Sequence, residues 1–273
     1  MKETIIVDPF SSGVAYAPEF ARLGFECIAV WSSPDISARV SKGFQSRHFV
    51  GNAIFDIDSA LERFAGRRFI AVVAGCEMGV AAAEALAARL GLPGNPSETT
   101  SLQRFKYDMQ RALEAAGLRH IPSVLLHDET EIGNLPSCID ERTFVVKPLN
   151  LASTDGVMFA REREGVADAL RRCGWGKVND LGERNRGFVV QPFVQGDEYV
   201  VEYGGGYSVA SVCRYRKETR NGSNFVYAGL DALDPHASRH ADLIDYTVRA
   251  ARSLGVRLGP RCTWNCSPVQ TVL

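Results

Sequence analysis

The chain has 273 residues, of which 45% are hydrophobic and 23% are charged, and its formal net charge is −1. This length suits about two domains, each able to bury a core. The balanced charge argues against a nucleic-acid surface, and no apolar run is long enough to span a membrane. The N-terminus lacks the pattern of a signal peptide, and the seven cysteines are scattered. We therefore expect a cytoplasmic protein with reduced thiols.

The first part of the chain alternates strand and helix patterns. The expected strands are 4–10, 27–31 and 69–75, and the expected helices are 15–24, 59–66 and 80–91. Continuous apolar strands between helices predict a parallel sheet covered on both faces. Ligands bind such sheets beyond the carboxyl ends of the strands, where the loops Asp8–Gly13 and Gly75–Gly79 are expected. Neither loop has the G-x-G-x-x-G pattern of a dinucleotide site.

A Pro/Gly/Asn-rich break at Leu92–Thr99 is the expected domain boundary. A single amphipathic helix is predicted directly after it. The elements expected from there on are a helix at 101–117, extended chain at 121–126, a strand ending at Lys147, a helix at 164–174, strands within 187–203 and at 207–216, and a helix at 237–255. The segment Arg214–Gly222 is expected to be a basic loop. Its cations Arg214, Arg216 and Lys217 either guide a phosphate or substrate carboxylate or belong to a solvated loop.

The segment Phe144–Val157 begins as an apolar strand and turns small and polar after Lys147. Two interpretations stay open. The first is a phosphate site, in which backbone N–H groups and one ammonium group surround an anion. The second is a β-hairpin whose turn is merely polar.

Several motifs in a fixed order resemble the ATP-grasp superfamily, most closely its carboxylate–amine ligases. These motifs are the segment Gly75–Asn95, the helix lysine Lys106, the strand-end lysine Lys147 with its loop, and the segment Gln191–Glu198. The resemblance covers residues from about 70 to 260. It implies an α/β chain with an N-terminal parallel, Rossmann-like domain and an α+β ATP-grasp domain of two lobes, the last of them incomplete. The implied bounds are 1–93 for the first domain, 94–122 for a linker helix region, 123–190 for the first lobe and 191–273 for the partial second lobe.

The resemblance also implies roles in phosphate binding. Lys147 would hold the α- and β-phosphates, and Lys106 would add a second positive charge. The loop containing Ser153, Thr154 and Gly156 would fold over the β- and γ-phosphates. Taken singly, Lys106 is more typical of a solvated helix face, and Lys147 is as typical of an ordinary strand end as of a phosphate site.

The nucleoside would be held by three further positions of the same family pattern. Gln191 stands where a glutamate is usual, and its amide oxygen would accept a bond from the adenine amino group. The backbone of Val194 would meet the adenine ring. Glu198 would accept both ribose hydroxyls, although on its own it is typical of a surface strand.

The implied cofactors are ATP and Mg²⁺, and the implied substrates are a small-molecule carboxylate and an amine. The carboxylate would attack the γ-phosphate, and the amine would then displace phosphate from the acyl phosphate. The alternatives are an ATP-binding module without catalysis and a biotin-carboxylase-like carboxylating enzyme. No nucleic acid or membrane partner is expected, and the oligomeric state is open, with a homodimer as one option.

The C-terminal segment departs from the family pattern, because Trp264 stands where the first magnesium-binding acid belongs and no E-x-N stretch follows. We expect the metal ligands to lie beyond the chain end, and the chain to be a truncated and weakly active or inactive ligase. Codons for Cys262–Cys266, read one base earlier, encode a peptide of the form V-H-L-E-L. We therefore hypothesise a frame shift, which sequencing of the downstream DNA would test.

Overall fold

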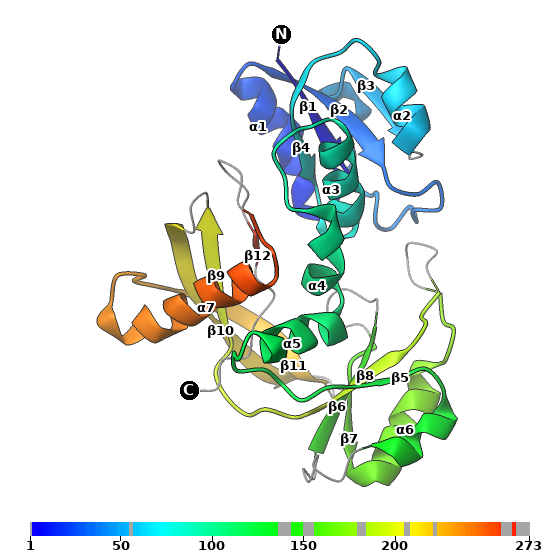
Figure 1. Cartoon of the computed structure of the whole chain (residues 1–273), viewed down its shortest axis with the longest axis vertical. Coiled ribbons are helices and arrows are strands. Elements are labelled where there is room, and N and C mark those ends of the chain that lie inside the picture. Colours follow the sequence, from blue (N-terminus) through cyan, green and yellow to red (C-terminus); the bar gives the residue numbers. More distant parts are fainter. Residues whose placement is uncertain are drawn as a thin grey trace. The chain divides into compact units, whose positions relative to one another are not determined.

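A computed structural model describes residues 2–54, 57–135, 143–149, 156–178, 184–204, 208–220, 223–257 and 264–265. The chain divides into two compact units, whose elements are labelled in Figure 1. The first unit is Met1–Thr100 with Gly176–Asn185, and the second is Ser101–Trp175 with Arg186–Leu273. The finer division at residues 93, 122 and 190 stays a prediction. No helix in the described part of the chain combines the length and the apolar character needed to cross a bilayer.

The first unit contains a parallel sheet in the order β3-β2-β1-β4. Its strands are β1 (Lys2–Val7), β2 (Phe25–Trp31), β3 (Gly51–Ile54) and β4 (Phe69–Ala74). The predicted parallel sheet is confirmed. The sequence analysis missed β3, because four residues beginning with Gly-Asn give too short an apolar run for a strand pattern.

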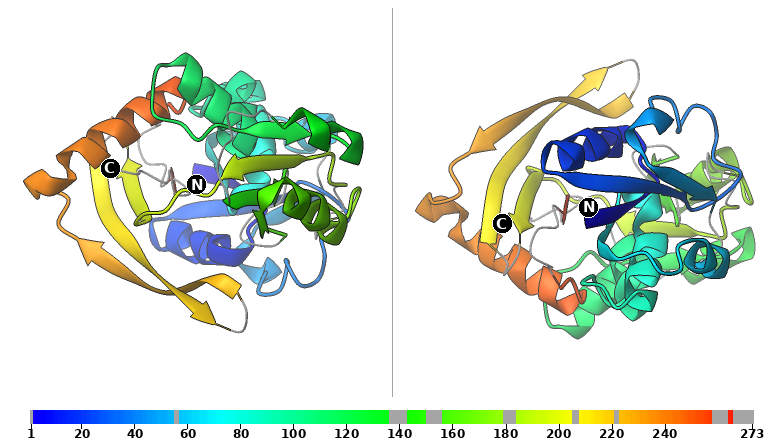
Figure 2. Two further views of the ribbon diagram at one scale, coloured as in Figure 1. Left: turned by 90° about the horizontal axis from the view of Figure 1, so that it is seen from below. Right: turned by 90° about the horizontal axis from the view of Figure 1, so that it is seen from above.

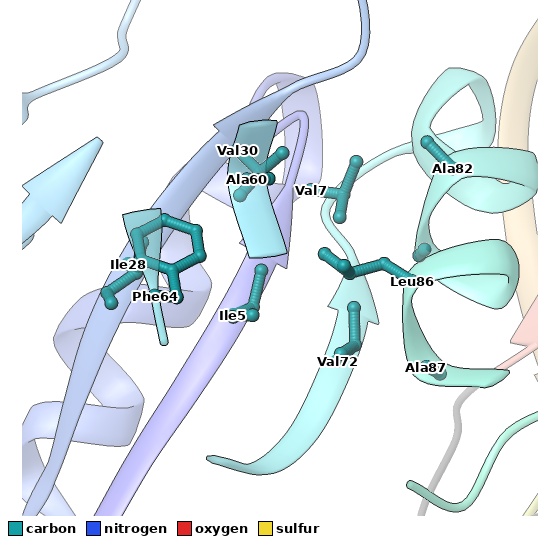
Figure 3. Close-up of a cluster of buried hydrophobic side chains, with 11 residues drawn as sticks. Ile5, Val7, Ile28, Val30, Ala60, Phe64, Val72, Ala82, Leu86 and Ala87 are labelled. Carbon is teal, nitrogen blue, oxygen red and sulfur yellow. The ribbon is translucent and has the colours of Figure 1, made fainter. Parts of the chain in front are cut away.

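Helices cover both faces of this sheet. They are α1 (Tyr16–Arg22), α2 (Ile57–Arg63) and α3 (Val80–Arg89). Phe64, directly after α2, and Leu86 of α3 belong to the core cluster on one face, and Leu86 projects toward Val7 and Val72 of the strands (Figure 3). Ala17 of α1 packs in a separate cluster with Ile6 and Cys27. Successive residues of a strand point to opposite faces, so the continuous apolar run of β1 supplies both clusters.

The carboxyl edge of the sheet is closely packed. A Cβ atom on Gly13 would lie 2.3 Å from the Gly75 carbonyl oxygen, and one on Gly75 would lie 2.4 Å from the Asp8 carbonyl oxygen. The Asp8 side chain is fully buried and accepts two hydrogen bonds from Ser32, from its backbone N–H at 2.8 Å and its hydroxyl at 2.6 Å. The loops after β1 and β4 therefore touch backbone to backbone, with a bonded carboxylate beside them.

The second unit contains two antiparallel sheets. The first has the order β5-β8-β6-β7 and is covered by α6 (Glu162–Cys173), whose Val166, Ala169 and Leu170 lie in its core. Its strands are β5 (Val124–Leu126), β6 (Thr143–Pro148), β7 (Met158–Arg161) and β8 (Phe188–Pro192). β6 and β7 are paired antiparallel, as the hairpin interpretation of this segment requires. The phosphate interpretation stays a prediction.

The second sheet has the order β11-β10-β9-β12, and α7 (Ala241–Ser253) lies along one face (Figure 2). Its strands are β9 (Tyr199–Gly204), β10 (Ser208–Arg220), β11 (Ser223–Leu233) and β12 (Trp264–Asn265). Leu243 of α7 packs against Val201 and Val212 of the strands. Leu113 of α5 packs in a further cluster with Ala250 of α7.

Two predictions for this unit are wrong. The single helix expected at 101–117 is two helices, α4 (Thr100–Arg104) and α5 (Lys106–Ala115), because Phe105 has extended dihedral angles of φ −92° and ψ 119°. The segment expected to be a basic loop is strand for most of its length, since β10 continues to Arg220 and pairs with β11. The Asn-Gly dipeptide between the strands, at 221–222, is typical of a hairpin turn and is the sequence signal for β11.

Candidate functional site

The candidate site is a group of charged side chains in the second unit, supplied by both of its sheets and by α5. Lys147 lies near the end of β6, and Lys106 is the first residue of α5. Glu198 directly precedes β9, and Lys217 lies on β10. Among the described residues, this group therefore contains three ammonium groups and one buried carboxylate, an excess of positive charge.

The pKa of Lys147 responds to the charges of the other three groups, which shows that they lie near it. Burial and the like charges of Lys106 and Lys217 together lower the pKa of the Lys147 ammonium group to about 8, while the charge of Glu198 opposes them. Lys106 also stands at a helix N-terminus, where the helix dipole disfavours a cation. A bound anion would relieve both of these unfavourable interactions.

Gln191 holds Lys147 in place. Gln191 lies on β8, is only 2% exposed, and accepts a hydrogen bond from Lys147 Nζ at its Oε1 (2.9 Å). Its Nε2 donates to Ser123 Oγ at 2.7 Å, and that hydroxyl donates to the Ile121 carbonyl oxygen at 2.8 Å. The residues Gln191 and Lys147 meet because β6 and β8 are neighbouring strands.

Glu198 is buried and already has two partners. Its Oε2 pairs with Lys217 Nζ, and its Oε1 accepts a hydrogen bond from the Tyr227 hydroxyl at 3.0 Å. The Tyr227 ring lies 4.4 Å from that of Tyr215, between centroids. Burial and the Glu198 charge raise the pKa of the Tyr227 phenol, so it remains a donor at neutral pH.

An irregularity in the pairing of β10 with β11 places Tyr227 at this site. Arg216 is paired with Gly229, but Lys217 is paired with Tyr227, so Ala228 is an extra residue on β11. Directly paired residues share a face of the sheet, and the bulge therefore brings Tyr227 to the face of Lys217. The sequence analysis missed Tyr227, Tyr215 and Ser123. A run of β-forming residues, Phe225–Tyr227, after Asn-Gly was a sequence signal for this strand.

The other predicted residues have different positions. Arg214 and Arg216 form ion pairs with Asp231, at 3.6 Å and 3.1 Å, so the structure does not group them with Lys217. Alternation along β10 turns Arg216 away from its neighbour Lys217. Val194 lies between β8 and β9 and is partly buried.

The loop expected to cover the phosphates is described only at its end. Gly156 has a positive φ of 70° and accepts a hydrogen bond from Cys173 Sγ at 3.3 Å, whereas Ser153 and Thr154 lie outside the described residues. Among the side chains that the structure describes, no group of three or more His, Cys, Asp or Glu residues could hold a metal ion.

Comparisons with known proteins agree on the fold. No family model matches the chain. Dapdiamide A synthase from Enterobacter agglomerans is 27% identical over 273 aligned positions, which cover 93% of this chain and 61% of that protein. An L-amino acid ligase from Bacillus licheniformis has a TM-score of 0.71 at 19% identity, over 95% of this chain and 61% of that structure.

A third comparison is with N5-carboxyaminoimidazole synthetase from Staphylococcus aureus, whose structure is complexed with ADP. It has a TM-score of 0.65 at 13% identity, over 92% of this chain and 63% of that structure. The chain has the fold of the ATP-grasp superfamily, as the sequence predicted. It spans about three fifths of the length of dapdiamide A synthase and of the L-amino acid ligase.

Proposed function

We propose that this chain carries the nucleotide-binding part of an ATP-dependent carboxylate–amine ligase. The observation that carries the proposal is the group of Lys106, Lys147 and Lys217 around the single buried carboxylate of Glu198. An excess of partly desolvated ammonium groups favours a polyanionic ligand such as the triphosphate of ATP. A cytoplasmic location and assembly as a homodimer stay predictions.

The proposed phosphate contacts use the lysines as donors. Lys147, positioned by Gln191, and Lys106 would bind phosphate oxygens, and Lys217 becomes a third donor if the nucleotide draws it from Glu198. The loop ending at Gly156 would exclude water from the phosphates. Mg²⁺ would neutralise charge on the transferring phosphoryl group.

The proposed nucleoside contacts lie at Glu198 and Val194. Each Glu198 oxygen has a second lone pair, so the carboxylate can still accept ribose hydroxyls while Lys217 and Tyr227 hold it. The Val194 backbone would meet the adenine ring. In the proposed reaction a carboxylate oxygen attacks the γ-phosphorus and ADP leaves. The amine then attacks the acyl carbon, phosphate leaves, and the nitrogen loses a proton.

Similarity in sequence to dapdiamide A synthase favours amide formation, rather than carboxylation of biotin, as the proposed reaction. Dapdiamide A synthase is similar to 93% of this chain, and its name denotes the synthesis of a compound with amide bonds. The alternative of an ATP-binding module without catalysis shares the same site. Binding and turnover must therefore be measured separately.

The test is thermal unfolding of the chain with ADP or ATP, with and without Mg²⁺, followed by an assay of phosphate release with amino-acid mixtures. A ligand at a hundred times its Kd stabilises the folded state by about 2.7 kcal/mol, so binding is readily detected. Stabilisation by nucleotides, but not by equal concentrations of inorganic phosphate, is expected. No stabilisation by millimolar nucleotide would overturn the proposal, and binding without phosphate release would favour the non-catalytic module.

A further inference from the structure

The side-chain amide of Gln191 is fixed at both ends, and the direction of each bond follows from chemistry. An ammonium group only donates, so the Gln191 oxygen must face Lys147 and the amide nitrogen must face Ser123. Ser123 then accepts from that nitrogen and donates its own proton to Ile121. The chain Ile121–Ser123–Gln191–Lys147 therefore has one consistent arrangement of donors and acceptors.

Burial makes this arrangement costly to disturb. Gln191 is 2% exposed, and the Lys147 side chain is also largely removed from water. Turning the amide toward another partner would leave Lys147 or Ser123 without its bond in a poorly hydrated region. A ligand that needed the Gln191 oxygen would have to share it with the ammonium group.

Charge points to the same conclusion. Among the residues that the structure describes, the ionised groups that act on Lys147 are Lys106, Lys217 and Glu198, and Glu198 is itself paired with Lys217. Gln191 offers Lys147 a dipole and no counter-charge. Gln191 therefore orients the Lys147 ammonium group without neutralising its charge, and that charge is left for a ligand to neutralise.

We propose that Gln191 is a positioning residue for Lys147 and does not recognise the adenine amino group. This inference rests on the proposed function and deepens it, because it assigns Gln191 to phosphate binding. It also replaces the role that the family resemblance gives to this side chain. Selection between purine bases must then come from other groups, such as the backbone after β8.

The experiment compares ATP with inosine triphosphate, which carries a carbonyl oxygen in place of the amino group. Binding of both nucleotides is measured calorimetrically for the unaltered chain and for Gln191→Met, which keeps the side-chain length and removes the bonds. We expect Gln191→Met to weaken both nucleotides by about tenfold, the worth of one charge-assisted hydrogen bond, with their affinity ratio unchanged within about twofold. Loss of ATP affinity alone, or no loss for either nucleotide, would overturn the inference.

Two further variants separate positioning from a general structural effect. Gln191→Glu retains an acceptor for Lys147 and adds a counter-charge that raises the pKa of the ammonium group, so the pH at which binding weakens should rise. Ser123→Ala releases the far end of the amide and should weaken both nucleotides by about threefold. It also gives a milder test if Gln191→Met does not fold. An unchanged pH profile in Gln191→Glu would contradict the inference, whereas failure of the unaltered chain to bind any nucleotide would contradict the proposed function instead.

Discussion

The two units each contain a group of buried polar side chains, and the two groups differ in charge balance. At the carboxyl edge of the first sheet, Asp8 receives two hydrogen bonds from Ser32, and glycine backbones fill the space beside it. In the second unit, three ammonium groups meet one carboxylate. The Asp8 carboxylate accepts hydrogen bonds in a closely packed edge, whereas the excess of positive charge in the lysine group is stabilised by an anion. Ligands of parallel sheets usually bind at the carboxyl edge. In this chain that edge is a weaker candidate for a ligand site than the lysine group of the second unit.

The largest expected effect concerns packing in the first unit. Gly75→Ala places a Cβ atom 2.4 Å from the Asp8 carbonyl oxygen and 2.7 Å from Pro9 Cα, both of them backbone atoms. We expect the free energy of unfolding to fall by about 3 kcal/mol or more, measured by urea denaturation. Gly51→Ala is the matched control, since no atom lies within 4 Å of its added Cβ. Equal stability of the two variants would show that the edge is loosely packed.

The next effect concerns the lysine group. Lys147→Met keeps the apolar stem and removes the ammonium group that Gln191 positions. We expect ATP affinity to fall by about 2 kcal/mol, or roughly thirtyfold. Calorimetric titration measures the affinity, and Lys42→Met, at an exposed lysine of the first unit, is the control. Unchanged ATP binding by Lys147→Met would contradict the assignment of the lysine group as the anion site.

The pH dependence gives a third test. The pKa of Lys147 is lowered from 10.5 to about 8, so the folded state holds fewer protons than the unfolded state between these values. The contribution of Lys147 to stability without ligand should therefore rise with pH from about 8 to about 10.5 and disappear in Lys147→Met. ATP affinity should fall by up to about 1.4 kcal/mol per pH unit above 8, because binding favours the charged form. A flat affinity profile between pH 7.5 and 9.5 would contradict the role of Lys147.

The smallest effect returns to the first unit. Ser32→Ala removes the hydroxyl that donates to Asp8 Oδ2 but keeps the backbone bond to Oδ1. We expect a loss of about 1 kcal/mol in the free energy of unfolding and no change in nucleotide affinity. Thermal unfolding and calorimetry on the same variant measure both quantities. A clear fall in ATP affinity would show that this edge takes part in binding after all.

Local sequence patterns predicted a large part of this arrangement. Apolar runs, helical periodicity and glycine stops located the parallel sheet, and the motif order led to Lys106, Lys147, Gln191 and Glu198. Patterns failed where a single dihedral angle mattered, as at Phe105, which divides one expected helix into two. They also failed for β11, although Asn-Gly at 221–222 is a recognised hairpin signal.

The sequence alone determined most of the order of strands and helices, the fold and the residue types available for an anion site, because these depend largely on neighbours along the chain. Tertiary structure alone decided which side chains of the site form hydrogen bonds with one another. Because β6 and β8 are paired, Lys147 can donate a hydrogen bond to the Gln191 oxygen. Because Ala228 is an extra residue on β11, Tyr227 faces Glu198 and donates a hydrogen bond to it. Such contacts join residues 29 to 44 positions apart, and they follow from register and burial, which no local pattern contains.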